Sequence, residues 1–175
     1  MPATVRRIRA DEWSLVRTLR LDALRDPAAP LAFLESYDDA ATLPDEFWQA
    51  RAAGSADGDH AAQLVAIDDD RWVGSTTALV QRSGTQDHHG RLIARSRPVL
   101  VGVYVRPSHR GTGVVGDLIE AAADWCRERG FTELVLNVHR DNHRAVAAYR
   151  RAGFVPSGLE FTGVIGPEIE MVRPL

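Results

Sequence analysis

A glycine-rich stretch between an apolar strand and a helix carries the clearest chemistry in the sequence. Residues 99–105 (VLVGVYV) are apolar enough for a buried strand, and residues 111–116 (GTGVVG) lead directly into a helical pattern. A loop of this kind leaves backbone N–H groups without partners at the positive end of the helix dipole. Such groups bind phosphate or pyrophosphate. The stretch therefore predicts a phosphate-bearing ligand.

The same six residues also satisfy G-x-G-x-x-G, the dinucleotide-binding fingerprint. In that fingerprint a strand runs directly into the first glycine, and an acidic residue about 20 positions further on binds the ribose. Here residues 106–110 separate the strand from Gly111, and the next strand ends in NVHR without an acidic residue. The P-loop of nucleotide triphosphatases is absent too, since no Gly-Lys-Ser/Thr follows. An NAD(P)-binding oxidoreductase stays only as an alternative.

Three further groups of reactive side chains favour structural roles. Asp68, Asp69 and Asp70 lie at a tight turn between two strand-like runs, without the spaced Gly and Glu of a calcium loop. His88 and His89 are adjacent rather than at metal-ligand spacing, which favours a mobile loop. Cys126 is the only cysteine and falls in a helical stretch, which favours a buried thiol over a nucleophile. We expect no metal site.

Three motifs together resemble the GCN5-related N-acetyltransferase (GNAT) family. The first is V-x-V-R-P-x-x-R-G-x-G-V at residues 103–114, and the second is N-x-x-A-x-x-x-Y-x-x-x-G-F at residues 142–154. The third is the closing strand that ends EMVRPL at residues 170–175. The resemblance covers residues 60–175 well, whereas the N-terminal helices resemble the family only in their order.

The resemblance implies transfer of an acetyl group from acetyl-CoA directly to a primary amine of a small molecule or peptide. The backbone of Val103, Tyr104 and Val105 would pair with the pantetheine arm as an added strand does. The following loop would hold the pyrophosphate through its amides, with a charge-assisted contact from its arginine. That loop consists of Arg110, Gly111, Thr112, Gly113, Val114, Val115 and Gly116. The family has Gly or Ala where this chain has Val115, so we expect the valine side chain to point away from the phosphates.

Two residues of the second motif match family positions near the thioester. Asn142 matches the asparagine that hydrogen-bonds the cofactor arm, and Tyr149 matches the tyrosine beside the sulfur. A spacing of seven residues is nearly two helical turns, which places both on one face about 10 Å apart. A tyrosine hydroxyl, with an ordinary pKa of about 10, is protonated at neutral pH and suits a general acid. The competing interpretations are a helix cap for Asn142 and a core aromatic for Tyr149.

The residue that takes the proton of the amine is not assigned by the resemblance. Family members that acetylate protein N-termini carry a glutamate five residues before the asparagine, where this chain has Asn137. The remaining candidates are Glu35, Asp38, Asp39 and His139. A water chain or an amine that arrives neutral would need no dedicated base. A non-catalytic acyl-CoA-binding or sensing module is a second alternative, against which the retained tyrosine argues.

The hydrophobic periodicity predicts an α/β fold that positions these residues. The element order is β-α-α-β-β-β-α-β-α-β-β, and the resemblance implies a mixed, mostly antiparallel sheet flanked by helices. The predicted strands cover residues 4–9, 63–67, 72–81, 99–105, 132–138, 154–164 and 168–173. The predicted helices cover residues 13–24, 43–53, 113–129 and 143–152.

Length and composition set the remaining expectations. The 175 residues are 45% hydrophobic and 26% charged, which fits one globular domain over residues 1–175. The net charge of −3 gives no basic footprint for nucleic acid, and no apolar run approaches the roughly 20 residues of a membrane span. We therefore expect a cytoplasmic protein without a membrane or nucleic-acid partner. Dimers are common in the family, so a homodimer is a further expectation.

Overall fold

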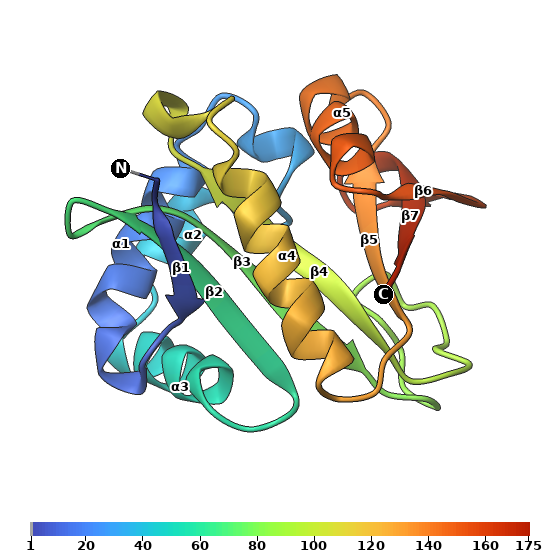
Figure 1. Ribbon diagram of the computed structural model, residues 1–175, viewed down its shortest axis with the longest axis horizontal. Helices are drawn as coiled ribbons and strands as arrows, with labels where there is room; N and C mark the ends of the chain where they lie inside the picture. Colours follow the sequence, from blue (N-terminus) through green and yellow to red (C-terminus); the bar gives the residue numbers. More distant parts are fainter. Residues whose placement is uncertain (1) are drawn as a thin grey trace.

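The computed structural model describes residues 2–175 and contains a seven-stranded sheet between helices on both faces (Figure 1). The strand order across the sheet is β1-β2-β3-β4-β5-β7-β6. The strands are β1 (Thr4–Arg7), β2 (Ala61–Asp68), β3 (Arg71–Gln81), β4 (Arg97–Val105), β5 (Glu133–His139), β6 (Val155–Gly163) and β7 (Gly166–Pro174). The helices are α1 (Trp13–Leu24), α2 (Tyr37–Ala41), α3 (Asp45–Ala56), α4 (Val114–Arg127) and α5 (His143–Arg151).

The sheet is antiparallel except at its centre, as the resemblance implied. β4 and β5 run parallel, and their register contains one residue pair, Val99 with Val135. On the outer side of β5, seven consecutive residues pair with β7. The sheet therefore consists of two well-paired parts, β1–β4 and β5–β7, which are joined near the start of β4 and β5 and diverge beyond it (Figure 1).

Two hydrophobic clusters hold the helices against the sheet. On one face α4 buries Leu118, Ile119 and Ala122 completely, together with strand residues that include Leu64. On the other face α1 and α3 pack over Val65, the next residue of β2. This alternation along β2 is the period of two that a strand buried on both faces requires. Burial of a Leu or Ile side chain of this size contributes about 1.5–3 kcal/mol.

The predicted elements are confirmed with small shifts of their ends, and one helix was missed. The short helix α2 lies in the Pro- and Ala-rich region for which no element was predicted; Ser36 caps it by accepting from the Asp39 amide at 3.1 Å. The turn between β2 and β3 is confirmed, with Asp69 and Asp70 at φ 45° and 60°. Such left-handed residues are typical of a tight hairpin turn.

The segment between β3 and β4 is folded onto the protein rather than free of it, contrary to the expected mobile loop. The Asp87 side chain is fully buried and accepts from the His89 amide at 2.9 Å and from Arg91 Nε at 2.8 Å. The Arg91 guanidinium lies 3.8 Å from the ring centre of Phe161 on β6. The His89 ring packs against the same phenyl ring at 4.9 Å. The segment therefore covers the β6–β7 hairpin.

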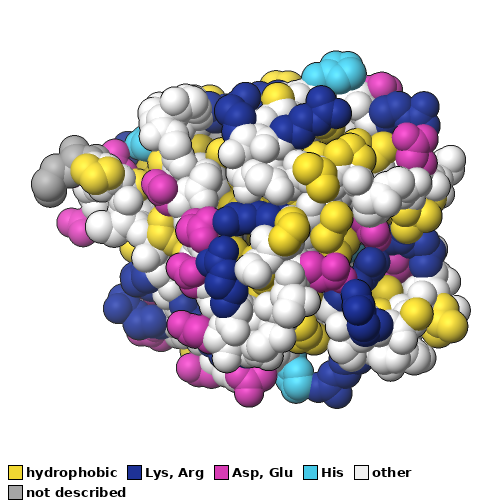
Figure 2. All heavy atoms as spheres, turned by 45° about the vertical axis from the view of Figure 1, so that its right-hand side comes forward, with side chains coloured by type: hydrophobic (Ala, Val, Ile, Leu, Met, Phe, Trp, Pro, Cys, Tyr) yellow, Lys and Arg dark blue, Asp and Glu magenta, His cyan; other side chains and the backbone are white. Residues whose placement is uncertain are grey.

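Opposite charges are mixed over the surface. Arginine and acidic side chains lie next to one another on the face drawn in Figure 2. Ion pairs within residues 2–175 include Arg106 with Asp22 at 2.8 Å. Among the helices formed within residues 2–175, all are too short or too polar to cross a bilayer.

Candidate active site

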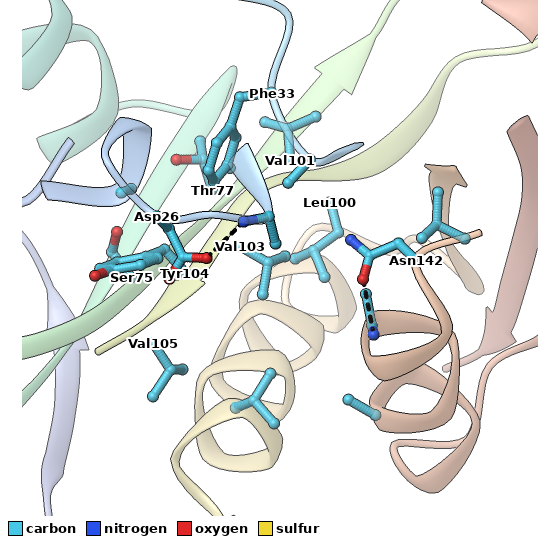
Figure 3. A pocket seen from close by; sticks show the side chains of 18 of the residues that line it. Asp26, Phe33, Ser75, Thr77, Leu100, Val101, Val103, Tyr104, Val105 and Asn142 are labelled. Atoms are coloured by element: carbon cyan, nitrogen blue, oxygen red, sulfur yellow. Dashed lines mark hydrogen bonds between the residues drawn. The ribbon is translucent and has the colours of Figure 1, made fainter. Parts of the chain in front are cut away.

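A cleft of about 920 Å³ opens where β4 and β5 diverge. Past the pair Val99–Val135, the edge of β4 that faces β5 has no strand partner within residues 2–175. Val103, Tyr104 and Val105 line the cleft. In Figure 3, Asn142 lies on one side of the cleft and Asp26 and Tyr104 on the other. The unpaired edge can accept an extended amide-containing chain in place of a strand.

A bulge shapes this edge of β4. The register between β3 and β4 shifts between Ser75 and Thr77, and Gly102 has a φ of 63°. A positive φ favours glycine, and an extra residue in one strand bends it. The Tyr104 side chain is buried among residues of the α1–α3 cluster, and this burial raises its pKa. Tyr104 therefore contributes its backbone to the cleft and its ring to the core.

The glycine loop forms an open cradle at the start of α4. Gly111 and Gly113 have φ values of 78° and 97°, and a Cβ atom at Gly111, Gly113 or Gly116 would meet no atom within 4 Å. The backbone N–H groups of residues 111–116 have no hydrogen-bond acceptor within residues 2–175. Six free amides at the positive end of a 14-residue helix are the kind of arrangement that can bind an anionic group such as a phosphate.

The three non-glycine residues after Arg110 in this loop, Thr112, Val114 and Val115, differ in how they face the cleft. Thr112 and Val114 do not line the cleft, and the Thr112 hydroxyl donates to the His109 carbonyl at 2.7 Å. Val115 is half-buried and packs against the core around α4, but it also borders the cleft. Thr112 and Val114 therefore present only their amides, and Val115 forms part of the wall.

Arg110 is held by the protein rather than left free for a phosphate. Its Nε donates to the Val105 carbonyl at 3.0 Å, and its Nη2 donates to Asp26 Oδ2. Burial alone would raise the pKa of Asp26, but hydrogen bonds from Arg110 and the Ala28 amide, with the nearby charge of Arg144, lower it overall. The expected phosphate contact of Arg110 therefore competes with a buried ion pair.

Asn142 and Tyr149 both line the cleft from α5. Asn142 caps the helix, since its Oδ1 accepts from the Ala145 amide at 3.2 Å, and its side-chain NH₂ group has no acceptor within residues 2–175. The cap and the cofactor contact are therefore compatible. Tyr149 is 9% exposed and its hydroxyl makes no hydrogen bond within the same residues. Burial raises its pKa, so the hydroxyl keeps its proton at neutral pH.

The four acidic or basic candidates for the proton acceptor differ in position. Glu35 lines the cleft but is paired with Arg20, and Arg51 lies 3.9 Å away. Asp38 and Asp39 lie on α2 and do not line the cleft. His139 lines the cleft and is buried.

A glutamate that was not among the candidates also lines the cleft. Glu168 is 4% exposed and lies opposite His139 in the β5–β7 pairing. Burial raises its pKa. Within residues 2–175, no group of His, Cys, Asp and Glu side chains is arranged to hold a metal ion.

Comparison with known proteins places this cleft in a family. Residues 18–154 match the sequence profile described as the Acetyltransferase (GNAT) family. The chain belongs to the GNAT family. The matched range includes the glycine loop, Asn142 and Tyr149. It assigns the glycine loop to a GNAT domain rather than to a dinucleotide-binding one.

Two curated GNAT-type relatives match parts of the chain. A streptothricin acetyltransferase from Streptomyces lavendulae is 44% identical over 64 residues, which are 37% of this chain and 34% of that protein. N-alpha-acetyltransferase 30 from Schizosaccharomyces pombe is 31% identical over 91 residues, which are 52% of this chain and 55% of that protein. The chain thus spans about a third and about half of the lengths of these relatives.

A solved GNAT structure matches over the whole chain. It is a phosphinothricin acetyltransferase from Sinorhizobium meliloti in complex with AcCoA, with a TM-score of 0.74 and 19% identity. The match covers 100% of this chain and 89% of the other. At this identity the likeness shows the fold, and it confirms the mixed sheet with flanking helices.

Proposed function

We propose that the protein is an N-acetyltransferase that uses acetyl-CoA to acetylate a primary amine of a small molecule or peptide. The observation that carries the proposal is a single cleft that combines three features. These are the six free amides at the start of α4, the unpaired edge of β4, and the hydroxyl of Tyr149, which lines the cleft. The names of the relatives support acetyl transfer, and the AcCoA complex of a protein with the same fold supports the donor.

The residues of the cleft fit the parts of this donor. The cradle at Gly111–Gly116 would bind the pyrophosphate, and Val103–Val105 would pair with the amides of the pantetheine arm. The free NH₂ group of Asn142 would donate to a carbonyl of that arm. Acetyl-CoA supplies an acyl group activated as a thioester. Tyr149 holds a proton that the departing sulfur requires.

The test is a panel of amines assayed for free thiol release with acetyl-CoA. The panel contains polyamines, aminoglycosides, amino acids and short peptides, and mass spectrometry identifies the acetylated product. The 21 basic residues of the chain are all arginine, so no lysine of the enzyme competes as an acceptor. Acetyl-CoA binding without thiol release from any amine would instead support the non-catalytic binding module.

We also propose that residues 1–175 act as one acetyltransferase domain in the cytoplasm. A homodimer stays a prediction from the family, and light scattering of the purified chain tests it. Fractionation of cells that express the chain from its own gene tests the location.

A further inference from the structure

Polar side chains of β5 and β7 lie together on one face of the sheet at the cleft. In the antiparallel register Asn137 is opposite Glu170, and His139 is opposite Glu168. Opposite residues of an antiparallel pair point to the same face, and so do residues two apart in one strand. Asn137, His139 and Glu168 all line the cleft. The two strands therefore bring an amide, an imidazole and a carboxylate to the same wall.

Two of these side chains have no partners that account for their burial. Both polar atoms of the Asn137 amide are buried without a hydrogen bond within residues 2–175. The same holds for Glu168 Oε2, and the Glu168 side chain is only 5% exposed. Buried polar groups are normally paired, because desolvation of an unpaired one is unfavourable. Unpaired groups on a cleft wall indicate a ligand with complementary polar atoms.

Glu170, the second glutamate of β7, differs from Glu168 in its charged partners. Glu170 Oε2 also lacks a well-aligned hydrogen bond within residues 2–175, but it forms an ion pair with Arg97, whose Nη2 lies 2.9 Å away. Glu170 Oε1 accepts from the Ser157 hydroxyl at 3.0 Å. Glu168 has no arginine within ion-pair distance, and its nearest cationic candidate is His89, with Nε2 at 3.4 Å. Of these two carboxylates, Glu170 is paired with an arginine, whereas Glu168 has only the His89 imidazole within ion-pair distance.

The groups around Glu168 keep it available as a base. Burial raises the pKa of Glu168, whereas the charge of Arg91 lowers it and Asp87 raises it further. Burial lowers the pKa of His89, so this imidazole is neutral at pH 7 and does not neutralise the carboxylate. A carboxylate whose pKa is moved toward neutrality is a more effective proton acceptor near pH 7.

The other candidates on the cleft wall are occupied. His139 Nδ1 accepts from the Asp141 amide at 3.1 Å, so the lone pair of this nitrogen is already used by the backbone. Glu35 is neutralised by Arg20. Glu168 is therefore the carboxylate of this wall that is free to meet an ammonium group.

We propose that Glu168 binds the ammonium group of the acceptor and takes its proton, while the Asn137 side-chain carbonyl orients the nitrogen. This inference rests on the proposed acetyl transfer, and it makes the acceptor an aliphatic primary amine that is protonated in solution. Such amines have a pKa of about 10, so without a base only a small fraction is nucleophilic at pH 7.

Glu168 takes one proton from R–NH₃⁺, and the freed electron pair forms the C–N bond to the acetyl carbon as the C–S bond breaks. The sulfur leaves with the electron pair of that bond and takes the proton of Tyr149. The nitrogen releases a second proton, which restores the Tyr149 hydroxyl, and Glu168 passes its proton to solvent. The sum is an amide, a thiol and one H⁺.

The test compares Glu168→Gln with Glu170→Gln, the matched control two residues away on the same strand. For an ammonium acceptor we expect Glu168→Gln to lower kcat/KM at pH 7 by about 10²-fold or more. The remaining rate should rise about tenfold per pH unit toward the amine pKa of about 10, because only free amine then reacts. Glu170→Gln should keep the wild-type pH profile. An arylamine, which is neutral at pH 7, should lose far less rate in Glu168→Gln.

Further measurements distinguish a failure of the role proposed for Glu168 from a failure of the proposed acetyl transfer. Calorimetry should show unchanged acetyl-CoA binding in Glu168→Gln, and Glu168→Asp should regain part of the rate with the wild-type pH profile even if Glu168→Gln folds poorly. A wild-type protein that acetylates no amine would overturn the acetyl-transfer proposal. A wild-type protein that acetylates amines, with Glu168→Gln giving the same rate and pH profile, would overturn only the role of Glu168. Equal losses for ammonium and neutral amines would also overturn that role.

Discussion

The guanidinium of Arg110 is hydrogen-bonded to the carboxylate of Asp26, a residue 84 positions earlier in the chain. The Asp26 side chain is 6% exposed and follows α1, whereas Arg110 begins the glycine loop in front of α4. Since the same arginine also donates to the Val105 carbonyl, one side chain ties the loop to β4 and to the N-terminal helices. The position of the cradle therefore depends on a residue outside the region of strongest motif similarity.

Asp26→Asn should lower the free energy of unfolding by about 1–3 kcal/mol at pH 7, because it removes the charge from a buried hydrogen bond. The folded-state pKa of Asp26 is below its ordinary value of 3.8, so its stabilising effect is present above that pH and is lost as the pH falls through the folded-state value. The difference between wild type and variant should therefore shrink in urea titrations at pH 3. Asp45→Asn, at the exposed Arg17–Asp45 pair, is the control and should change stability little.

Gly116→Ala should affect stability and ligand binding in opposite directions. Gly116 lies in the first turn of α4, and a Cβ there meets no protein atom, so alanine should stabilise the free protein by up to about 1 kcal/mol. The same methyl group enters the cradle and should weaken acetyl-CoA binding. Thermal unfolding without ligand and calorimetry with ligand measure the two effects. An unchanged affinity would contradict the proposed position of the pyrophosphate.

Tyr149→Phe should lower kcat by about 10²-fold or more while leaving acetyl-CoA affinity unchanged, because it removes only the transferable proton. The ring keeps its packing against Phe154, whose centre lies 6.0 Å away, so stability should change little. Thiol release at saturating amine measures kcat, and calorimetry measures the affinity. A rate equal to that of the wild type would exclude Tyr149 as the general acid.

Cys126 should not react with thiol reagents in the folded protein. It is fully buried in α4, and burial raises the pKa of its thiol to about 12. Since the thiolate is the reactive form, a disulfide reagent should detect no thiol in native protein and one per chain in urea. This result matters in practice, because the same reagent reports free CoA in the activity assay. A native-state signal would show that α4 opens locally.

Much of the fold could be predicted because its elements have strong local patterns. The apolar stripe of α4 and the continuous apolar run of β5 each indicate one type of element, and the glycine loop marks where the helix begins. The short helix α2 was missed because five residues are too few for a helical period, and its start depends on the cap by Ser36.

The parts of the site that could not be predicted depend on pairing between distant segments. Glu168 reaches the cleft because β7 pairs with β5, which lies two strands earlier in the sequence. No local pattern distinguishes it from Glu170, whose charge is neutralised by Arg97 of β4. The contact of Arg110 with Asp26 is equally distant in sequence. By contrast, Asn142 and Tyr149 lie on one helix, so their shared face followed from spacing alone.

The single register pair between β4 and β5 has a consequence beyond binding. A sheet interrupted at its centre lacks the hydrogen bonds that a continuous ladder provides, and under the proposed function a ligand between the two strands would supply some of them. A ligand at 100 times its dissociation constant raises the free energy of unfolding by about 2.7 kcal/mol. The proteolytic lifetime of the chain should therefore lengthen as the concentration of its ligand increases, which would couple the amount of protein to the supply of the proposed donor.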